Sequence, residues 1–145
     1  MRRDGANATR VLADMVNRSR FRAQLQVIML QGIALAGFNV VDVHGLHEAT
    51  GLPVLVVSRR RPALDAIRRA LLAHVPGGAR KWRLIERAGP MEPIKGVYVQ
   101  RAGLDPSEAQ ALLERFAVHS AVPEPLRTAH LIAGGIARGE SRQRV

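Results

Sequence analysis

A short apolar run that ends in a polar residue is the feature that most constrains the fold of this chain. The four residues up to Leu30 are apolar, Gln31 follows them, and a loop punctuated by glycines comes next. A run this short is typical of a buried strand, which we expect at residues 25–30. Open α/β sheets bind ligands beyond the carboxyl ends of their strands. Gln31 is therefore the first candidate functional residue, although an amide cannot hold a divalent cation as a carboxylate does.

A second continuous apolar run predicts that the two strands are parallel. It covers residues 54–57, between Pro53 and three consecutive arginines. Each of the two runs is followed by a helical pattern, near Asn39 to Gly51 after the first and from Pro62 to about His74 after the second. Apolar strands separated by helices favour an α/β fold with a parallel sheet covered on both faces.

Hydrophobic spacing and capping residues predict the other elements. Asn39 and Asp42, three residues apart, resemble the capping residues of the helix predicted near Asn39 to Gly51. Such a capping role alone would explain why both residues are polar. Asp105-Pro106-Ser107-Glu108 is a strong helix start. The remaining expected helices cover residues 6–18 and 123–136, and further strands are expected at residues 82–86 and 96–100.

Length and charge indicate one domain with a polyanionic partner. The chain has 145 residues, 47% of them hydrophobic, which suits a single domain over residues 1–145 with a flexible basic tail at residues 140–145. The net charge is +10, and all but Lys81 and Lys95 of its 22 basic side chains are arginine, which suits bidentate contact with DNA or RNA phosphates. The alternative is that this composition reflects the genome and that the charge is ordinary solvated surface.

Several classes of protein are disfavoured. The absence of cysteine excludes disulfides, thiolate zinc sites and a cysteine nucleophile. There is no apolar run of the roughly 20 residues that span a bilayer and no signal peptide, so we expect a cytoplasmic protein without a membrane partner. The chain also lacks a dinucleotide-binding glycine fingerprint, a P-loop and a serine nucleophile elbow. Aromatic residues make up only 3%, which argues against a platform for stacking bases.

The candidate binding residues follow the second strand. Arg59, Arg60 and Arg61 come directly after it, so at least one guanidinium should lie near Gln31 at the carboxyl edge of the sheet. This run indicates either a contact with phosphate or nucleic acid, or a solvated turn.

The histidines are weaker candidates. His44 and His47 share one side of a predicted helix, but no third ligand for zinc is visible nearby. His130 lies beside the apolar stripe of the last helix, one turn after Arg127, where an imidazole can act as an acid, a base or a phosphate donor. A hydrogen-bonded structural histidine is the alternative for His130.

Over nearly its whole length the chain resembles the endonuclease dU family, an endonuclease-V-like group long labelled as a domain of unknown function. The segments that carry the resemblance are Asp4-Gly5, Ala8-Thr9, Asn17-Arg18-Ser19-Arg20-Phe21, Gln24-Leu25, Val27, Met29-Leu30, Gly37-Phe38-Asn39-Val40-Val41-Asp42, His47-Glu48, Thr50-Gly51-Leu52-Pro53-Val54, Arg59-Arg60, Pro62, Ile85-Glu86-Arg87-Ala88-Gly89, Val97-Tyr98-Val99-Gln100, Ala102-Gly103, Pro123-Glu124-Pro125-Leu126-Arg127 and Ala129-His130-Leu131-Ile132-Ala133.

The resemblance implies a ribonuclease H-like mixed sheet flanked by helices, and cleavage of nucleic acid near altered bases such as deoxyuridine with Mg²⁺ or Mn²⁺ as cofactor. The family expects a metal-binding aspartate where this chain has Gln31, and another in an amino-terminal strand that this chain does not contain. We therefore expect impaired nuclease activity with retained binding of nucleic acid. The residues that remain for a site are His130 and Asp42 as catalytic candidates, and Arg59, Arg60, Arg61 and Arg127 as nucleic-acid contacts.

The resemblance also implies that the amino-terminal antiparallel strands are missing. Without them the strand at residues 25–30 becomes an edge with unpaired backbone groups. Either the true start lies upstream, or a strand-donating partner or a second copy in a homo-oligomer covers the edge. The alternative function is therefore that of a non-catalytic interaction subunit that completes its sheet in this way.

Overall fold

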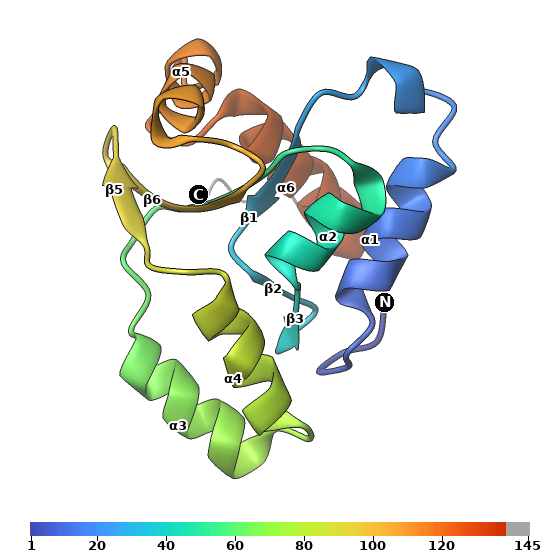
Figure 1. The fold of residues 1–145 in the computed structure, drawn as a ribbon, viewed down its shortest axis with the longest axis vertical. Coiled ribbons are helices and arrows are strands. Elements are labelled where there is room, and N and C mark those ends of the chain that lie inside the picture. The colour runs from blue at the N-terminus through green and yellow to red at the C-terminus, as the bar shows by residue number, and fades with distance from the viewer. Residues whose placement is uncertain (139–145) are drawn as a thin grey trace.

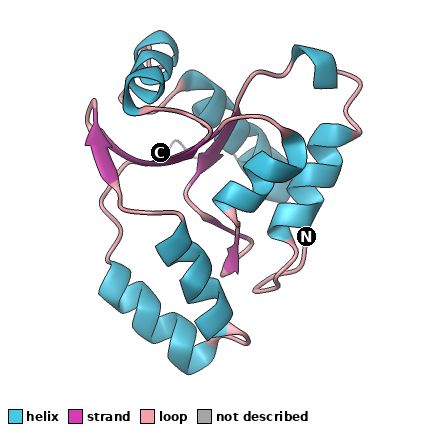
Figure 2. Ribbon diagram, viewed as in Figure 1, coloured by secondary structure: helices cyan, strands magenta, loops and turns pink. Residues whose placement is uncertain are grey.

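A four-stranded mixed sheet with helices on both faces forms the centre of the molecule (Figures 1 and 2). The structure is a computed structural model and describes residues 1–138. In order across the sheet, the strands are β1 (Ile28–Gln31), β4 (Val54–Ser58), β6 (Val97–Ala102) and β5 (Glu92–Ile94). Strands β1 and β4 are parallel, and β6 is antiparallel to both of its neighbours.

The two apolar runs form the parallel pair that the sequence predicts. Ile28 lies beside Val54 and Gln31 lies beside Val57. β1 is shorter than expected, because residues 25–27 precede the strand, while Gln31 is its last residue. The first four residues of β4 are all buried, as expected for a strand covered on both faces.

The two faces of the sheet pack against different helices. These are α1 (Ala8–Asn17) and α2 (Val43–Thr50) on one face, and α5 (Pro106–Phe116) and α6 (Glu124–Arg138) on the other. Leu30, Val54 and Val56 belong to a cluster with α1 and α2. Leu55 and Val57 point the other way, into a cluster with α5 and α6.

The predicted strand at residues 82–86 is wrong, because these residues lie inside the helix α4 (Gly78–Arg87). The buried positions Gly78, Lys81, Ile85 and Ala88 have helical spacing. Gly78 permits a close contact with α3 (Leu64–His74), because a Cβ atom there would lie 1.9 Å from the Leu71 carbonyl oxygen. In Figure 1, α3 and α4 form a pair below the sheet.

Asn39 does not cap α2, contrary to the prediction, because it belongs to the small β2–β3 hairpin and is fully buried. Its side-chain oxygen accepts a hydrogen bond from the Ala8 N–H, so it serves the start of α1 instead. Asp42 is the residue that caps α2, accepting a hydrogen bond from Gly45 N–H at 3.0 Å. The hairpin strands are β2 (Ala34–Leu35) and β3 (Asn39–Val40), and one turn of 3₁₀ helix covers Arg22–Gln24.

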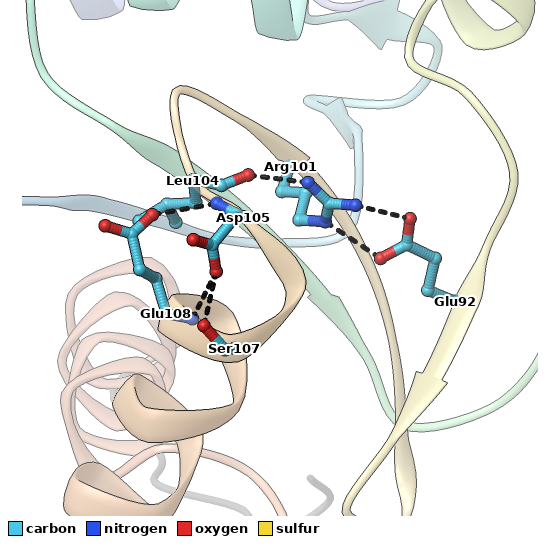
Figure 3. A network of polar contacts seen from close by, with 6 residues as sticks. All are labelled: Glu92, Arg101, Leu104, Asp105, Ser107 and Glu108. Atoms are coloured by element: carbon cyan, nitrogen blue, oxygen red, sulfur yellow. Dashed lines mark hydrogen bonds and ion pairs between the residues drawn. The ribbon is translucent and has the colours of Figure 1, made fainter.

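The helix start at Asp105 is confirmed as a capping box (Figure 3). The Asp105 side chain accepts hydrogen bonds from the Glu108 N–H and from the Ser107 hydroxyl. These two bonds, the Ser107 one foremost, hold the pKa of the Asp105 carboxyl below its ordinary value. The last helix is confirmed as well, as α6, whereas the tail predicted at residues 140–145 lies outside the described residues.

No helix within residues 1–138 combines the length and the apolar character that crossing a membrane requires.

Candidate nucleic-acid interface

The carboxyl ends of β1 and β4 form one edge, which we call the strand-end edge. A hydrogen bond of 3.0 Å from the Gly32 N–H to the Val57 carbonyl oxygen joins the two strands just beyond Gln31. Gln31 is exposed there, on the face of the sheet that carries Met29. The parallel pairing therefore puts Gln31 where an open α/β sheet presents its ligand-binding groups.

Arg59, Arg60 and Arg61 leave this edge as a short loop between β4 and α3. The Ser58 hydroxyl donates a 2.7 Å hydrogen bond to the Arg60 carbonyl oxygen, which fixes the start of the loop. All three arginine residues are exposed. None of them forms an ion pair with a carboxylate among residues 1–138. Their guanidinium groups are therefore open to an anionic ligand.

A cavity of about 420 Å³, which we call the basic pocket, brings two of the predicted binding residues together. Arg59 comes from the end of β4 and Arg127 from the first turns of α6. His119 and Ser120, from the loop between α5 and α6, also line the pocket. The lining contains no carboxylate residue. The pocket therefore offers cations and polar hydrogens to a ligand.

The position of Arg127 in the basic pocket is fixed by its own helix. Its Nη1 donates to Glu124 Oε1 at 3.0 Å, one turn earlier, and the side chain is only 25% exposed. This contact neutralises part of the charge, but it leaves the other guanidinium N–H groups available. A side chain held in this way loses less conformational freedom when it binds a phosphate.

His119 is the residue that sequence reasoning missed. It lies far along the chain from Arg59, and only the packing of the α5–α6 loop against the end of β4 brings the two to one pocket. The sequence contains no periodic or motif signal for that contact. Arg60 and Arg61 do not line the basic pocket and extend the cationic surface beyond it.

Asp42 has a structural role in the described residues. Its Oδ1 caps α2, and its Oδ2 forms an ion pair of 3.0 Å with Arg87 of α4. It lines a different cavity, between α1, α2 and α4, and not the basic pocket. The structure does not gather Asp42 with Arg59 and Arg127, so a catalytic role for Asp42 stays a prediction.

Of the histidines, His119 lines the basic pocket, whereas the predicted candidate His130 does not. His130 is exposed on α6 and is not among the residues that line the basic pocket, and its catalytic role stays a prediction. His47 has a packing role, since its Nδ1 lies 2.8 Å from the Leu52 carbonyl oxygen and its ring lies where a side chain at Gly103 would be.

The residues of the strand-end edge do not fit a Mg²⁺ or Mn²⁺ ion. These ions prefer several oxygen ligands that include carboxylates. Gln31 supplies only an amide oxygen, and the described part of the chain contains no group of three or more His, Cys, Asp or Glu side chains that could hold a metal. The positive charge of the loop of Arg59, Arg60 and Arg61 at the same edge makes it still less favourable for a cation.

A mixed sheet between two helical layers, with arginines at its strand-end edge, defines an α/β protein with a cationic surface site. The chain belongs to the endonuclease dU family, whose family model matches residues 1–137. The family predicted from the sequence is thus confirmed.

Named relatives support the same assignment. A UPF0215 protein from Deinococcus radiodurans is 64% identical over 141 residues, which cover 97% of this chain and 72% of the relative. A UPF0215 protein from Methanothermobacter thermautotrophicus is 46% identical over 98% of this chain and 71% of its own length. The crystal structure of a protein of unknown function from Archaeoglobus fulgidus matches with a TM-score of 0.91 and 39% identity, over 96% of this chain and 80% of that one.

Proposed function

We propose that this chain binds DNA or RNA at its strand-end edge, on a ribonuclease H-like sheet, and that its metal-dependent endonuclease activity is impaired. The observation that carries the proposal is the basic pocket, where Arg59, which has no carboxylate partner among the described residues, and Arg127, which keeps free N–H groups beside its contact with Glu124, converge from distant parts of the chain. Membership of the endonuclease dU family supports nucleic acid as the ligand class.

The chemistry of the edge suits a phosphodiester backbone. A guanidinium group donates two parallel hydrogen bonds to a phosphate, and its charge attracts the phosphate over a longer range. Arg60 and Arg61 continue the positive surface beyond the pocket, so that consecutive phosphates of one strand meet consecutive cations. Contacts of this kind hold and orient the strand without reading its sequence.

Impaired cleavage follows from the residue at the end of β1. Cation-assisted hydrolysis of a phosphodiester relies on carboxylate ligands that fix the ion beside the attacking water. Gln31 carries no charge, and Asp42 is engaged by Gly45 and Arg87. A nucleic acid held by the arginines would therefore be bound without being cut. The family resemblance makes DNA that contains deoxyuridine the first substrate to test.

The test measures binding as a function of salt. Fluorescence anisotropy with deoxyuridine-containing DNA, and with RNA of matched sequence, should give affinities that fall linearly on a log–log plot against salt. The expected slope is about −0.9 for each phosphate contacted on duplex DNA. Lack of binding to either nucleic acid at low salt would overturn the proposal. Nicking of the same DNA by the purified protein with Mg²⁺ or Mn²⁺ would contradict the proposal that the endonuclease activity is impaired.

A second candidate function rests on the open edge of the sheet. β1 is the outermost strand of the sheet within residues 1–138. Met15 on α1 is 62% exposed, and Ile132 and Ile136 on α6 are 57% and 84% exposed. The unpaired backbone groups of an edge strand can pair with a strand of another chain. Exposed apolar side chains favour burial in an interface with another protein. The chain would then act as an interaction subunit, with its sheet completed by a strand-donating partner or by a second copy.

Sedimentation of the purified chain tests the second candidate. Self-association that strengthens with concentration would support a second copy, and co-purification of a partner that supplies a strand would support a heteromeric complex. A monodisperse monomer at high concentration, obtained without a partner, would exclude this role.

A further inference from the structure

A second cavity, which we call the α1–α4 cavity, lies between α1, α2 and the start of α4. Its volume is about 610 Å³, within the range of roughly 300–1,000 Å³ that is typical of pockets for small organic ligands. Ala13 of α1, Val40 of β3 and Leu84 of α4 give it an apolar wall. Within residues 1–138 it shares no lining residue with the basic pocket, so it is a separate site.

The start of α4 forms another wall of this cavity. Gly77, Arg80 and Lys81 line the cavity there. No side chain caps this helix start among the described residues, and the first turn contains no acidic residue. The backbone N–H of Arg80 likewise has no acceptor in the part of the chain that the structure describes. Free N–H groups and the positive end of the helix dipole favour an anionic ligand.

Lys81 adds a buried positive charge to the wall. The residue is only 3% exposed, and its ammonium group donates to the Asp4 carbonyl oxygen at 2.5 Å. An ammonium group has three N–H donors, and residues 1–138 supply neither a second acceptor nor a carboxylate partner for it. Burying a charge without a counter-ion is costly. An anion in the cavity would supply the missing counter-charge.

Two arginines extend the positive charge of the cavity toward solvent. Arg10 of α1 and Arg80 of α4 both line the cavity, and both are exposed. Neither forms an ion pair with a carboxylate among the described residues. A ligand that enters the cavity therefore meets these two guanidinium groups before it reaches Lys81.

The carboxylates of the lining do not cancel this charge. Asp42 forms an ion pair of 3.0 Å with Arg87, which leaves Asp14 as the one other acidic residue in the described lining. Three cations therefore share the cavity with one carboxylate that has no ion-pair partner within residues 1–138. Such an excess of positive charge is complementary to a dianion.

We propose that the α1–α4 cavity binds a small phosphomonoester, with the phosphate against Lys81 and the start of α4 and the organic part against the apolar wall. A phosphomonoester carries a charge of about −1.5 to −2 near pH 7 and three strong acceptor oxygens, which match the excess of cations and the free N–H groups. Each phosphodiester of a nucleic acid carries one negative charge and continues on both sides, so it suits the open arginine loop better than a cavity.

Calorimetric titration tests the chemistry of the ligand. The probes are inorganic phosphate, phenyl phosphate and phenol, at a constant ionic strength set by NaCl. Both phosphates should bind, and phenyl phosphate should bind about tenfold more tightly, because its ring adds contact with the apolar wall. Phenol should bind far more weakly than phenyl phosphate. Lack of binding by both phosphates, or equal affinities for phenol and phenyl phosphate, would overturn the proposal.

Two matched variants place the bound phosphate in the cavity. Arg80→Ala removes a lining guanidinium, whereas Arg83→Ala makes the same change at an exposed position of α4 that does not line the cavity. Arg80→Ala should weaken phenyl phosphate binding about tenfold and Arg83→Ala less than about twofold. Equal affinities of the two variants would overturn the proposal.

A further variant tests the buried charge. Lys81→Met keeps the apolar stem without the ammonium group and should lose most of the phosphate affinity. Far-UV circular dichroism checks that this variant folds. If it does not fold, Arg10→Ala, at an exposed position of the lining, takes its place with an expected loss of about tenfold. Full affinity in the folded variant that is tested would contradict the proposal.

The same variants separate a small phosphomonoester from the phosphates of a bound strand. Arg80→Ala and Arg83→Ala should bind deoxyuridine-containing DNA with equal affinity, because the cavity lies apart from the arginine loop. If Arg80→Ala alone weakens binding of this DNA, the cavity belongs to the nucleic-acid surface, and its assignment to a small phosphomonoester is wrong.

Discussion

Two arginine sites at opposite ends of the central strands differ in what surrounds the charge. Arg101, on β6, donates from Nε and Nη2 to the Glu92 carboxylate at 2.9 and 3.0 Å and from Nη1 to the Leu104 carbonyl oxygen at 2.6 Å (Figure 3). The hydrogen bond to Glu92 raises the pKa of Arg101 above its ordinary value. The loop of Arg59, Arg60 and Arg61 has no carboxylate partner among the described residues.

The difference teaches that the arginines of this chain divide into two kinds. The Arg101 guanidinium donates to the Glu92 carboxylate and to the Leu104 carbonyl oxygen. These bonds hold together β5, β6 and the segment before α5.

The guanidinium groups of Arg59, Arg60 and Arg61 at the strand-end edge are exposed and form no ion pair among the described residues, so their hydrogen-bonding capacity remains for a ligand. The net charge of +10 therefore indicates a binding surface where guanidinium N–H groups stay available, which is the case for the arginine loop and for the part of Arg127 that Glu124 does not engage.

Replacing Arg59, Arg60 and Arg61 together by alanine should have the largest effect on function. If these side chains contact phosphates, affinity should fall on the order of tenfold to hundredfold and the salt dependence should flatten by about one unit for each lost contact. The free energy of unfolding should change little, because the three residues are exposed. Anisotropy titrations at several salt concentrations measure the first effect, and urea unfolding measures the second.

A matched control removes the same charge elsewhere. Arg18, Arg20 and Arg115 are also exposed, and they lie away from the strand-end edge. Replacing these three by alanine should weaken binding far less. An equal loss of affinity in both triple variants would mean that only net charge matters, and would remove the distinction between the two kinds of arginine.

Arg101→Ala should show the opposite pattern, with a loss of stability and little loss of binding. Three hydrogen bonds would be lost, and the Glu92 carboxylate would remain half-buried without its partner. Because the ion pair is partly exposed, we expect a decrease of about 1–2 kcal/mol in the free energy of unfolding. Arg101→Lys should recover only part of it, since lysine cannot form the bidentate contact. Unchanged stability of Arg101→Ala would show that this charge is not structural.

The capping box at Asp105 gives a smaller effect, visible as a dependence on pH. Since the folded state lowers the pKa of Asp105, its carboxylate stabilises the protein fully above the ordinary aspartate pKa, and this contribution is lost as the pH falls through the lowered value. Asp105→Asn keeps a good capping residue without the charge, so it should reduce the acid-induced loss of stability. Thermal unfolding between neutral pH and about pH 3 measures it. Asp65→Asn makes the same substitution at an exposed position in the first turn of α3 and serves as the matched control.

The parts of the fold that the sequence predicts are those determined by local pattern. The two parallel strands, the capping box at Asp105 and the last helix depend on apolar runs and on caps that lie within one segment. The prediction of a strand at residues 82–86 is wrong because the glycine pair before it resembles the end of a helix. Gly78 instead starts α4, at the point where α3 approaches closely. The predicted capping role of Asn39 is wrong because its hydrogen-bond partners, Ala8 and Asn7, are distant in sequence.

The candidate site divides in the same way. Gln31 and the arginine loop could be predicted because each directly follows a strand, and the end of a strand is a position that local pattern gives. The meeting of Arg59 with His119 and Arg127 could not be predicted in full, because it depends on how the α5–α6 loop packs against β4. Asp42 shows the converse, since a carboxylate that was a catalytic candidate lines a different cavity and has Arg87 and Gly45 as its partners.

Gln31→Asp should have the smallest effect and is the sharpest test of the edge as a binding surface. A single aspartate beside the arginine loop adds one negative charge to an exposed position, so affinity for nucleic acid should fall only about twofold. Cleavage of deoxyuridine-containing DNA with Mg²⁺ or Mn²⁺ should stay at background, because one carboxylate does not supply the ligand set that these ions need and the described residues offer no cluster to complete it. Gln31→Asn, which keeps the amide, is the control for the change in side-chain length. Cleavage gained by Gln31→Asp but not by Gln31→Asn would show that the rest of a catalytic centre survives at this edge, and that one lost charge separates a binding surface from a nuclease.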